Sequence, residues 1–344
     1  MKVVVVTSDV PFIYGGHIVL AEELTKQLNK NGYEAVLWKT PQNKFGHQLS
    51  AYLANYLTDL TETGYGGKID AVISLRFPAY AVKHPKHICW LNHRMREYYD
   101  LWYKFCANLS FLNLIKENVR KFIIHRIDTY LLKHNVKKLF AQSKNIQNRL
   151  RKWGKIESEV LYPPAVERVY RFDKYGEYIL IPSRLYELKR VDLAIKALPY
   201  VRNKELSLMI VGEGPEIDKL IQLTRNLKIE DRVKFMNRLS DEELVDVYAK
   251  CLAVFYGPLN EDYGLVTLEA FSSKKAVITC SDCGGVTELI ENNENGMIVD
   301  ADEKMIAAAF DTISNKSIAE KLGHNGYILS KKYSWKEIIQ KLLS

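Results

Sequence analysis

Short apolar runs alternate along the chain with segments whose apolar residues recur at helical spacing. The runs at residues 2–7 and 252–256 have the length and composition of buried strands. Residues 17–31 and 191–201 instead repeat Leu, Val or Ala every three or four positions, as the inner face of a helix does. Single strands that alternate with helices are typical of parallel sheets, so the pattern predicts an α/β, doubly wound fold.

The length of 344 residues exceeds a comfortable single core and favours two domains. The Pro163-Pro164 pair stiffens the chain, and the strand and helix alternation restarts at Tyr178. We therefore expect one Rossmann-like domain over residues 1–165 and a second over residues 166–330. An amphipathic helix is expected within the remaining residues, 331–344.

Composition narrows the function classes only slightly. Hydrophobic residues make up 47% and charged residues 26% of the chain, no apolar run could span a membrane, and Met1-Lys2 leads straight into a strand. A cytoplasmic location is the expectation.

Five cysteines argue against a disulfide framework, and Cys280-x-x-Cys283 has no second pair or nearby His to complete a zinc site. The net charge of +8 suits an anionic ligand, but no nucleic-acid-binding motif accompanies it.

The stretch NEDYGLVTLEAFS, residues 260–272, is the richest in candidate chemistry. It follows a buried strand and a Gly257-Pro258 turn, and its apolar spacing predicts a helix that begins near Gly264. The first turn of such a helix can hold a phosphate with its unpaired amides. Glu261 before the helix and Glu269 on its second turn could then bind sugar hydroxyls. A surface loop that leads into an ordinary helix is the alternative.

Two cations, Arg184 and Lys189, follow the predicted strand at residues 178–182. Cations between a strand end and a helix start can clamp a diphosphate and stabilise a leaving nucleotide. Two surface cations without a ligand would give the same pattern.

The candidates in the first half of the chain are weaker. Gly15-Gly16 follow the first strand without the G-x-G-x-x-G spacing of a dinucleotide fold, so they fit a close ligand approach or a ligand-free tight turn equally well. His93 follows the predicted strand at residues 87–91, where ligands collect in open α/β sheets. Residues 94–102 are expected to form a helix, which could merely cap a neutral His93.

Residues 111–140 are basic and apolar at once. Leu112, Ile115, Val119, Phe122 and Ile123 recur at helical spacing beside several Lys and Arg residues. Two interpretations stay open: a core helix with a solvated basic face, which we favour, and a basic amphipathic helix that lies on an anionic bilayer.

Taken together, these motifs resemble retaining GT-B glycosyltransferases of the family 4 type, the glycosyl transferases group 1. Residues 261–270, EDYGLVTLEA, resemble the E-x7-E signature of that family, and Gly212-Glu213-Gly214-Pro215 resembles its G-x-G-P. Residues 183–190 resemble G-R-L-x-x-x-K-G, with Ser183 and Arg190 in place of the glycines. That departure keeps the cations but leaves the path of the loop open.

The resemblance implies two Rossmann-like domains that face a cleft, with the terminal helix crossing back to the first domain. The second domain would hold a nucleoside diphosphate sugar and the first an acceptor, with no bound metal or other cofactor. The D-x-D at residues 300–302 is accordingly interpreted as a helix cap. The implied catalytic residues are His93, Arg184, Lys189 and Glu261. The implied donor-binding residues are Gly15, Gly16, Gly212, Arg238, Asp262, Tyr263, Gly264, Leu265, Val266 and Glu269.

The function expected from this resemblance is retaining, metal-independent hexosyl transfer to a sugar, glycan or lipid-linked acceptor, in cell-surface polysaccharide or glycoconjugate synthesis. Peripheral contact at the inner membrane face through residues 111–140 is the open alternative to a purely cytoplasmic location, and no nucleic acid is expected. The alternatives are a GT-B nucleotide-sugar hydrolase or epimerase, which needs no acceptor, and a non-catalytic protein that binds the donor and leaves it intact. The donor sugar, its base and the acceptor stay open.

Overall fold

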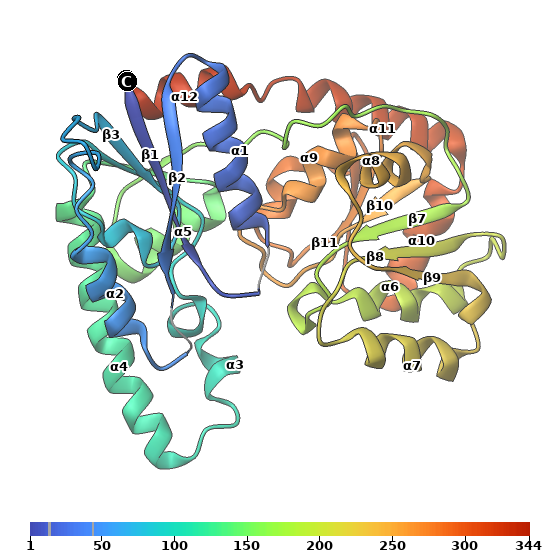
Figure 1. The fold of residues 1–344 in the computed structure, drawn as a ribbon. Coiled ribbons are helices and arrows are strands. Elements are labelled where there is room, and N and C mark those ends of the chain that lie inside the picture. The colour runs from blue at the N-terminus through green and yellow to red at the C-terminus, as the bar shows by residue number, and fades with distance from the viewer. Residues whose placement is uncertain (13–14, 43–44) are drawn as a thin grey trace. The chain divides into compact units, whose positions relative to one another are not determined.

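The computed structural model describes residues 1–12, 15–42 and 45–344. The chain divides into an N-terminal unit, residues 1–163 with 335–344, and a C-terminal unit, residues 164–334. The boundaries expected after residues 165 and 330 lie within a few residues of this division. Figure 1 shows the course of the chain through each unit.

The N-terminal unit is built on a parallel sheet with the strand order β2-β1-β3-β4-β5-β6. β1 is buried along most of its length because it pairs with β2 on one side and β3 on the other. The strands are β1 Lys2–Asp9, β2 Glu34–Pro41, β3 Ala71–Ser74, β4 His87–Leu91, β5 Lys138–Ala141 and β6 Glu159–Val160.

Helices cover this sheet, and one of them comes from the far end of the chain. α12 buries Ile338, Ile339, Leu342 and Leu343, and its Trp335 ring meets the Trp90 ring edge to face at 6.2 Å between centroids. The helices are α1 Gly16–Lys30, α2 Gln48–Tyr56, α3 Trp102–Cys106, α4 Phe111–Tyr130, α5 Lys144–Gly154 and α12 Trp335–Leu343. Among the described residues, none of the helices of either unit combines the length and apolarity that a membrane crossing needs.

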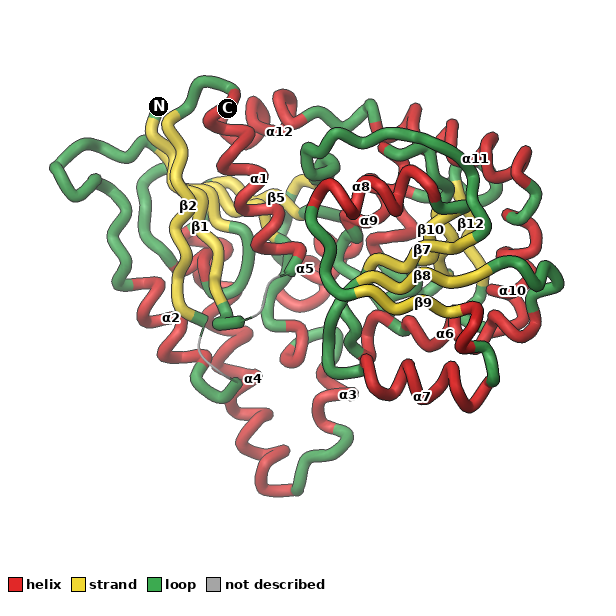
Figure 2. Tube along the Cα trace, turned by 45° about the vertical axis from the view of Figure 1, so that its right-hand side comes forward, coloured by secondary structure: helices red, strands yellow, loops and turns green. Residues whose placement is uncertain are grey.

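The C-terminal unit has a second parallel sheet, with the order β12-β11-β10-β7-β8-β9. Figure 2 shows its strands side by side with helices on both faces. The strands are β7 Tyr178–Pro182, β8 Ser207–Val211, β9 Val233–Met236, β10 Ala253–Phe255, β11 Val277–Cys280 and β12 Gly296–Val299. The helices are α6 Val191–Ala197, α7 Ile217–Leu227, α8 Asp241–Lys250, α9 Leu265–Ser272, α10 Glu303–Ile313 and α11 Lys316–Ser330.

Both sheets are doubly wound, and each has a point where the strand order reverses. In the N-terminal unit this switch point lies between β1 and β3, and in the C-terminal unit between β7 and β10. Ligands of open α/β sheets bind beyond the carboxyl ends of the strands at such a point. The loop after β7 carries Arg184 and Lys189, and the loop after β10 carries Glu261.

Several local predictions were wrong. Residues 94–102 are not a continuous helix but a 3-10 turn, Arg96–Tyr98, before the short α3. α2 was missed because its sequence, QLSAYLANY, mixes polar and apolar residues without a clear stripe. The helix expected to reach Val201 ends at Ala197, where a 3-10 turn that contains Pro199 begins.

The cap interpretation of residues 300–302 is confirmed, since Asp302 accepts hydrogen bonds from the Lys304 and Met305 amides that open α10.

The core interpretation of the basic apolar segment was also wrong. Leu112, Ile115, Val119, Phe122 and Ile123 lie on α4 as expected, but all five side chains are exposed. The reason is that other residues of α4 meet the protein: Ile124 with Leu114 and Ile127, and the acids Glu117 and Asp128.

Candidate functional site

A half-buried ion pair joins the two loops at the switch point of the C-terminal unit. The Lys189 ammonium donates to Glu261 Oε1 at 2.8 Å and to the Tyr256 hydroxyl oxygen at 3.0 Å. Lys189 ends a 3-10 turn after β7, and Glu261 follows β10, so neighbouring strands bring together residues that are 72 positions apart. Burial first, and then the Glu261 charge, raise the pKa of Tyr256, so its hydroxyl stays protonated.

The cation loop needs glycines on the neighbouring loop. Gly212 and Gly214 follow β8 at φ values of +145° and +158°, where L side chains are strained. A Cβ at Gly212 would collide with the Ser183 carbonyl, and one at Gly214 with the Leu185 carbonyl. The backbone of the Arg184 segment therefore packs directly on the Gly212 loop, and the exposed Arg184 guanidinium lies over the Tyr186 ring.

The path of the cation loop, which the sequence left open, is set by Arg190. This residue adopts the left-handed conformation, with φ at +48°, at the position where the family has glycine. Its guanidinium donates to Asp282 Oδ2 at 2.7 Å and to the Gly257 carbonyl at 2.8 Å. The side chain thus holds the loop after β7 to the loops after β10 and β11, and offsets the strain of its own backbone.

The segment between Glu261 and α9 is tightly held by backbone contacts. The Glu261 amide donates to the Cys283 carbonyl, and the Gly285 amide donates to the Glu261 carbonyl, both at 2.9 Å. Asp262 and Tyr263 are buried, and Gly264 at φ +93° turns the chain into α9, which begins at Leu265. The expected helix start is confirmed, and the amides of Leu265 and Val266 lie in its first turn.

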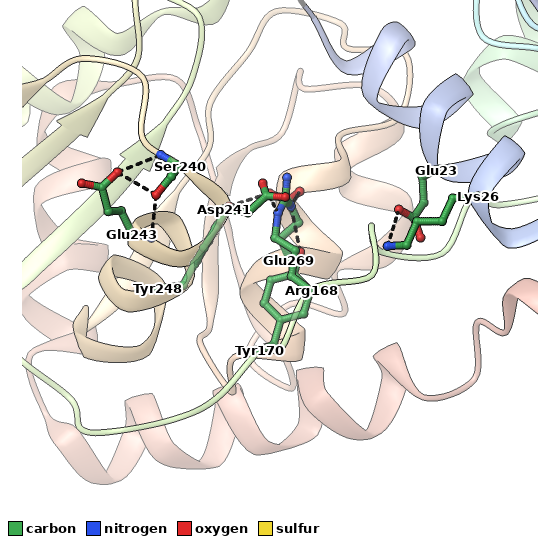
Figure 3. A network of polar contacts seen from close by, with 9 residues as sticks. All are labelled: Glu23, Lys26, Arg168, Tyr170, Ser240, Asp241, Glu243, Tyr248 and Glu269. Atoms are coloured by element: carbon green, nitrogen blue, oxygen red, sulfur yellow. Dashed lines mark hydrogen bonds and ion pairs between the residues drawn. The ribbon is translucent and has the colours of Figure 1, made fainter. Parts of the chain in front are cut away.

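Glu269 on α9 lies at the centre of a polar cluster that the sequence did not predict (Figure 3). Its Oε1 accepts from the Arg168 guanidinium at 2.7 Å, and its Oε2 accepts from the Tyr248 hydroxyl at 3.0 Å. Arg168 also donates to the Asp241 carboxylate and to the Tyr170 hydroxyl. Burial, the largest single influence, opposes the charge of Arg168, but Glu269, Tyr170 and Asp241 together outweigh it and raise the pKa of the guanidinium.

The cluster fixes the carboxylate that is expected to bind a ribose. Each carboxylate oxygen has a second lone pair, so Glu269 can still accept from further hydroxyls while Arg168 and Tyr248 hold it. No local motif marks Arg168, because it lies 101 residues before Glu269 in an irregular segment. Arg168 is one of three basic residues within residues 165–175, so nothing in the sequence singles it out.

Arg238 lies beside the glycine loop. It is exposed after β9, and its amide donates to Glu213 Oε1 at 3.4 Å. The structure thus groups Arg184, Lys189, Gly212, Arg238, Glu261 and α9 along the carboxyl edge of one sheet.

His93, Gly15 and Gly16 belong to the N-terminal unit. Gly15 is the N-cap of α1, where its carbonyl accepts from the Ile18 amide; residues 13–14 between it and β1 lie outside the described residues. His93 follows β4 and its Nδ1 lies 2.7 Å from the Arg94 carbonyl oxygen. It lines a small hollow with Arg94, Arg96, Asp100 and Arg149, where cations outnumber the single acid.

Cys280, Asp282 and Cys283 come close enough to share a metal ion. However, Asp282 binds the Arg190 guanidinium, which also lies 3.6 Å from the Cys283 sulfur. A fixed cation on one of three potential ligands disfavours a second cation at the same place. This argues against a metal ion at these three residues. The wider expectation that the protein binds no metal stays a prediction.

Comparison with known proteins settles the family. Residues 165–338, slightly more than half of the chain, match the family model described as glycosyl transferases group 1. The chain belongs to this family. An uncharacterized glycosyltransferase of Methanocaldococcus jannaschii is 24% identical over 238 residues, which cover 63% of this chain and 64% of that protein.

A second relative is named for its donor and acceptor. The GDP-mannose-dependent alpha-(1-6)-phosphatidylinositol monomannoside mannosyltransferase of Mycobacterium tuberculosis is 28% identical over 172 residues, 46% of this chain and 44% of that protein. The chain thus spans between 44% and 64% of the length of these two relatives.

The fold has a solved counterpart. The crystal structure of HepE from Anabaena, in complex with UDP-glucose, has a TM-score of 0.73 at 16% identity and covers 100% of this chain and 98% of its own. The group 1 glycosyl transferase has the GT-B fold, with two Rossmann-like units as the sequence predicted.

Proposed function

We propose that this group 1 glycosyl transferase moves a hexose from a nucleoside diphosphate sugar to a sugar, glycan or lipid-linked acceptor, with retention of anomeric configuration and without a bound metal. The names of its relatives support donors of this class, with GDP-mannose in one and UDP-glucose in another. A role in cell-surface polysaccharide or glycoconjugate synthesis is part of the proposal.

The observation that carries the proposal is the charge arrangement at the switch point of the C-terminal unit. Arg184 and Lys189 leave the carboxyl end of β7, and α9 begins with its amides close in sequence to Glu261. A diphosphate held there would meet two cations and the positive end of a helix dipole. The same groups would stabilise the charge that develops on the departing nucleotide.

The Lys189–Glu261 pair is expected to organise the site before a donor binds. Because the pair is half-buried and also bonded to Tyr256, the ammonium is held in one place rather than sampling many rotamers. Glu261 would bind sugar hydroxyls, Glu269 the ribose, and His93 of the N-terminal unit would position the reacting sugar.

Isothermal titration calorimetry with UDP and GDP tests the donor site. Lys189→Ala and Glu269→Ala should each weaken binding of the preferred nucleotide at least ten-fold, or about 1.4 kcal/mol. Lys234→Ala, which removes an exposed lysine on β9, is the matched control and should leave affinity unchanged. Unchanged affinity in both site variants would refute the assignment.

Reaction analysis separates transfer from the alternatives. NMR of the product should show the anomeric configuration of the donor, and activity should persist in EDTA. Release of free sugar at the same rate with and without acceptors would favour a hydrolase. A donor left intact through long incubation with a broad acceptor panel would favour a binding protein.

A further inference from the structure

Helix α4 of the N-terminal unit differs from an ordinary surface helix in burying its acids and exposing most of its apolar residues. The residues that it buries are Glu117, Ile124 and Asp128, so two of the three are acids. A helix that merely covers a sheet buries an apolar stripe and exposes its charges. α4 instead buries both of its acids beside Ile124, with Leu114 and Ile127 packed partly buried against the core, and leaves its other apolar residues exposed.

Dedicated partners satisfy the buried acids. The hydroxyls of Tyr52, Tyr80 and Tyr99 all donate to the fully buried Asp128 carboxylate. Burial first, and then the Asp128 charge, raise the pKa of each of these tyrosines, so they remain protonated donors.

The first half of α4 is held in the same way. Glu117 accepts from the Tyr98 hydroxyl at 2.8 Å and pairs with Arg120. Since polar contacts fix the inner side at Glu117 and at Asp128, the helix cannot turn to bury its apolar residues without leaving these acids unpaired. The orientation of α4 is therefore set from the inside.

The apolar residues of α4 point to water. Exposed fractions are 77% for Leu112, 49% for Ile115, 57% for Val119 and 60% for Phe122, and we call these four the outer stripe. With 3.6 residues per turn they fall on the side of the helix opposite Glu117 and Asp128. Figures 1 and 2 show that the N-terminal half of α4, where most of the outer stripe lies, projects beyond the sheet of its unit.

The charges beside the outer stripe all have one sign. Lys116 and Arg126 are exposed, and the Arg126 guanidinium lies 5.0 Å from the centre of the Phe122 ring. Arg120 instead pairs with Glu117, Lys121 lies over the Trp102 ring on the inner half of the helix, and both acids of the helix are buried. The solvent side of α4 is thus apolar and cationic, without an exposed carboxylate on this described helix.

We infer that the outer stripe and its cations form a docking surface for an anionic lipid bilayer. Apolar side chains can enter the headgroup and acyl boundary while Lys and Arg stay with the lipid phosphates, which is how interfacial helices bind. A second copy that packed its outer stripe on this one about a two-fold axis would bring cations against cations. The inference stands apart from the proposed function, since it uses no residue of the nucleotide site.

Vesicle flotation with the full chain tests the inference. The probes are vesicles of phosphatidylcholine alone and vesicles with about one-third phosphatidylglycerol, each at low and high salt. We expect binding to the anionic vesicles that weakens with salt, because surface charge is screened. The variant Ile115→Ser/Val119→Ser/Phe122→Ser should bind at least ten-fold more weakly, and Lys116→Glu/Arg126→Glu should lose the preference for anionic lipid.

The matched control is Met305→Ser/Ile328→Ser, which removes two exposed apolar residues of the C-terminal unit and should leave vesicle binding unchanged. Urea unfolding followed by tryptophan fluorescence should show that the N-terminal unit of both α4 variants is folded, since all five tryptophans lie in that unit. Nucleotide affinity by calorimetry should be the same in all three variants, which separates this test from that of the donor site. Failure of the unaltered protein to float with anionic vesicles would overturn the inference. So would undiminished binding by the triple Ser variant, or a dimer in light scattering that this variant dissociates.

Discussion

In the C-terminal unit, carboxylates and cations meet at the carboxyl edge of the sheet, where Lys189 binds Glu261 and Arg168 binds Glu269. In the N-terminal unit, the two acids of α4 are instead buried, and the outer stripe of the same helix faces water. Most of the exposed large apolar side chains among the described residues belong to the N-terminal unit. The same α/β architecture thus carries two different surfaces. The C-terminal unit has a preformed charged site, and the N-terminal unit has an apolar, cationic helix face.

The largest expected effect would break the inner anchor of α4. Asp128→Ala leaves the Tyr52, Tyr80 and Tyr99 hydroxyls buried without their acceptor, which should lower the free energy of unfolding of the N-terminal unit by about 3 kcal/mol. Urea unfolding followed by tryptophan fluorescence measures this, because the five tryptophans, at positions 38, 90, 102, 153 and 335, all lie in that unit.

The matched control for this prediction is Glu62→Ala, which removes an exposed acid of the same unit. Its urea midpoint should stay close to that of the unaltered protein. Equal midpoints for the Glu62 and Asp128 variants would mean that the three tyrosines find other partners, and the orientation of α4 would then not be fixed from the inside.

A second prediction uses pH to separate the units. Burial lowers the pKa of His87 to about 3, whereas an unfolded histidine titrates near 6.5. Below pH 6.5 the unfolded chain therefore binds a proton that the folded unit does not, so stability falls as the pH falls. Between pH 7 and pH 5 the N-terminal unit should lose about 2 kcal/mol from this group.

Tryptophan fluorescence in urea at both pH values measures this loss, and His87→Asn should reduce it. The His87 ring bonds to Ser74 Oγ at 2.8 Å, so the variant also tests whether the ring itself or its neighbours cause the slope. An unaltered pH slope in His87→Asn would assign the effect to other groups.

A third prediction concerns how the charged site is held. Arg168→Ala removes the guanidinium that fixes Glu269 Oε1, so nucleotide affinity should fall about ten-fold, or about 1.4 kcal/mol. Because we propose that Glu269 binds the ribose, the preference for a ribonucleoside diphosphate over its 2′-deoxy analogue should shrink as well.

Calorimetry with both nucleotides distinguishes this positioning role from general damage. Arg168→Lys keeps a cation near Glu269 and should restore part of the preference. If Arg168→Ala weakened both nucleotides by the same factor, Arg168 would support the unit as a whole rather than orient Glu269.

The smallest expected effect compares two replacements of Arg190. Both Arg190→Ala and Arg190→Gly remove the contacts to Asp282 and Gly257, but only glycine relieves the left-handed backbone. The glycine variant should therefore be about 1 kcal/mol more stable than the alanine variant. Calorimetric unfolding of the two proteins measures the difference, and an equal transition temperature would show that the loop carries no backbone strain.

Sequence patterns predicted the parts of this molecule that depend on local spacing. The alternation of strands and helices, the start of α9 at Leu265 and the cap at Asp302 all follow from residues a few positions apart. Arg168 reaches Glu269 across 101 positions, and Tyr52 reaches Asp128 across 76, so no local pattern could reveal either contact.

The misjudged orientation of α4 has the same origin. A helical stripe of apolar residues shows that a helix has two different faces, but not which of them meets the protein. That choice depends on tyrosines from other segments, which reach the helix only once the fold has assembled. Their hydroxyls satisfy the buried carboxylates of α4; the tyrosines are Tyr52, Tyr80, Tyr98 and Tyr99.

The position of α12 has a consequence for biogenesis. Residues 335–344 complete the N-terminal unit, where the Lys86 ammonium donates to the Leu343 carbonyl at 2.9 Å. During translation this segment follows all of the C-terminal unit, so the part of the protein that is synthesised first is finished last. Until then, the surface of the N-terminal unit that Trp335 covers at Trp90 stays open to water, which exposes the nascent chain to aggregation.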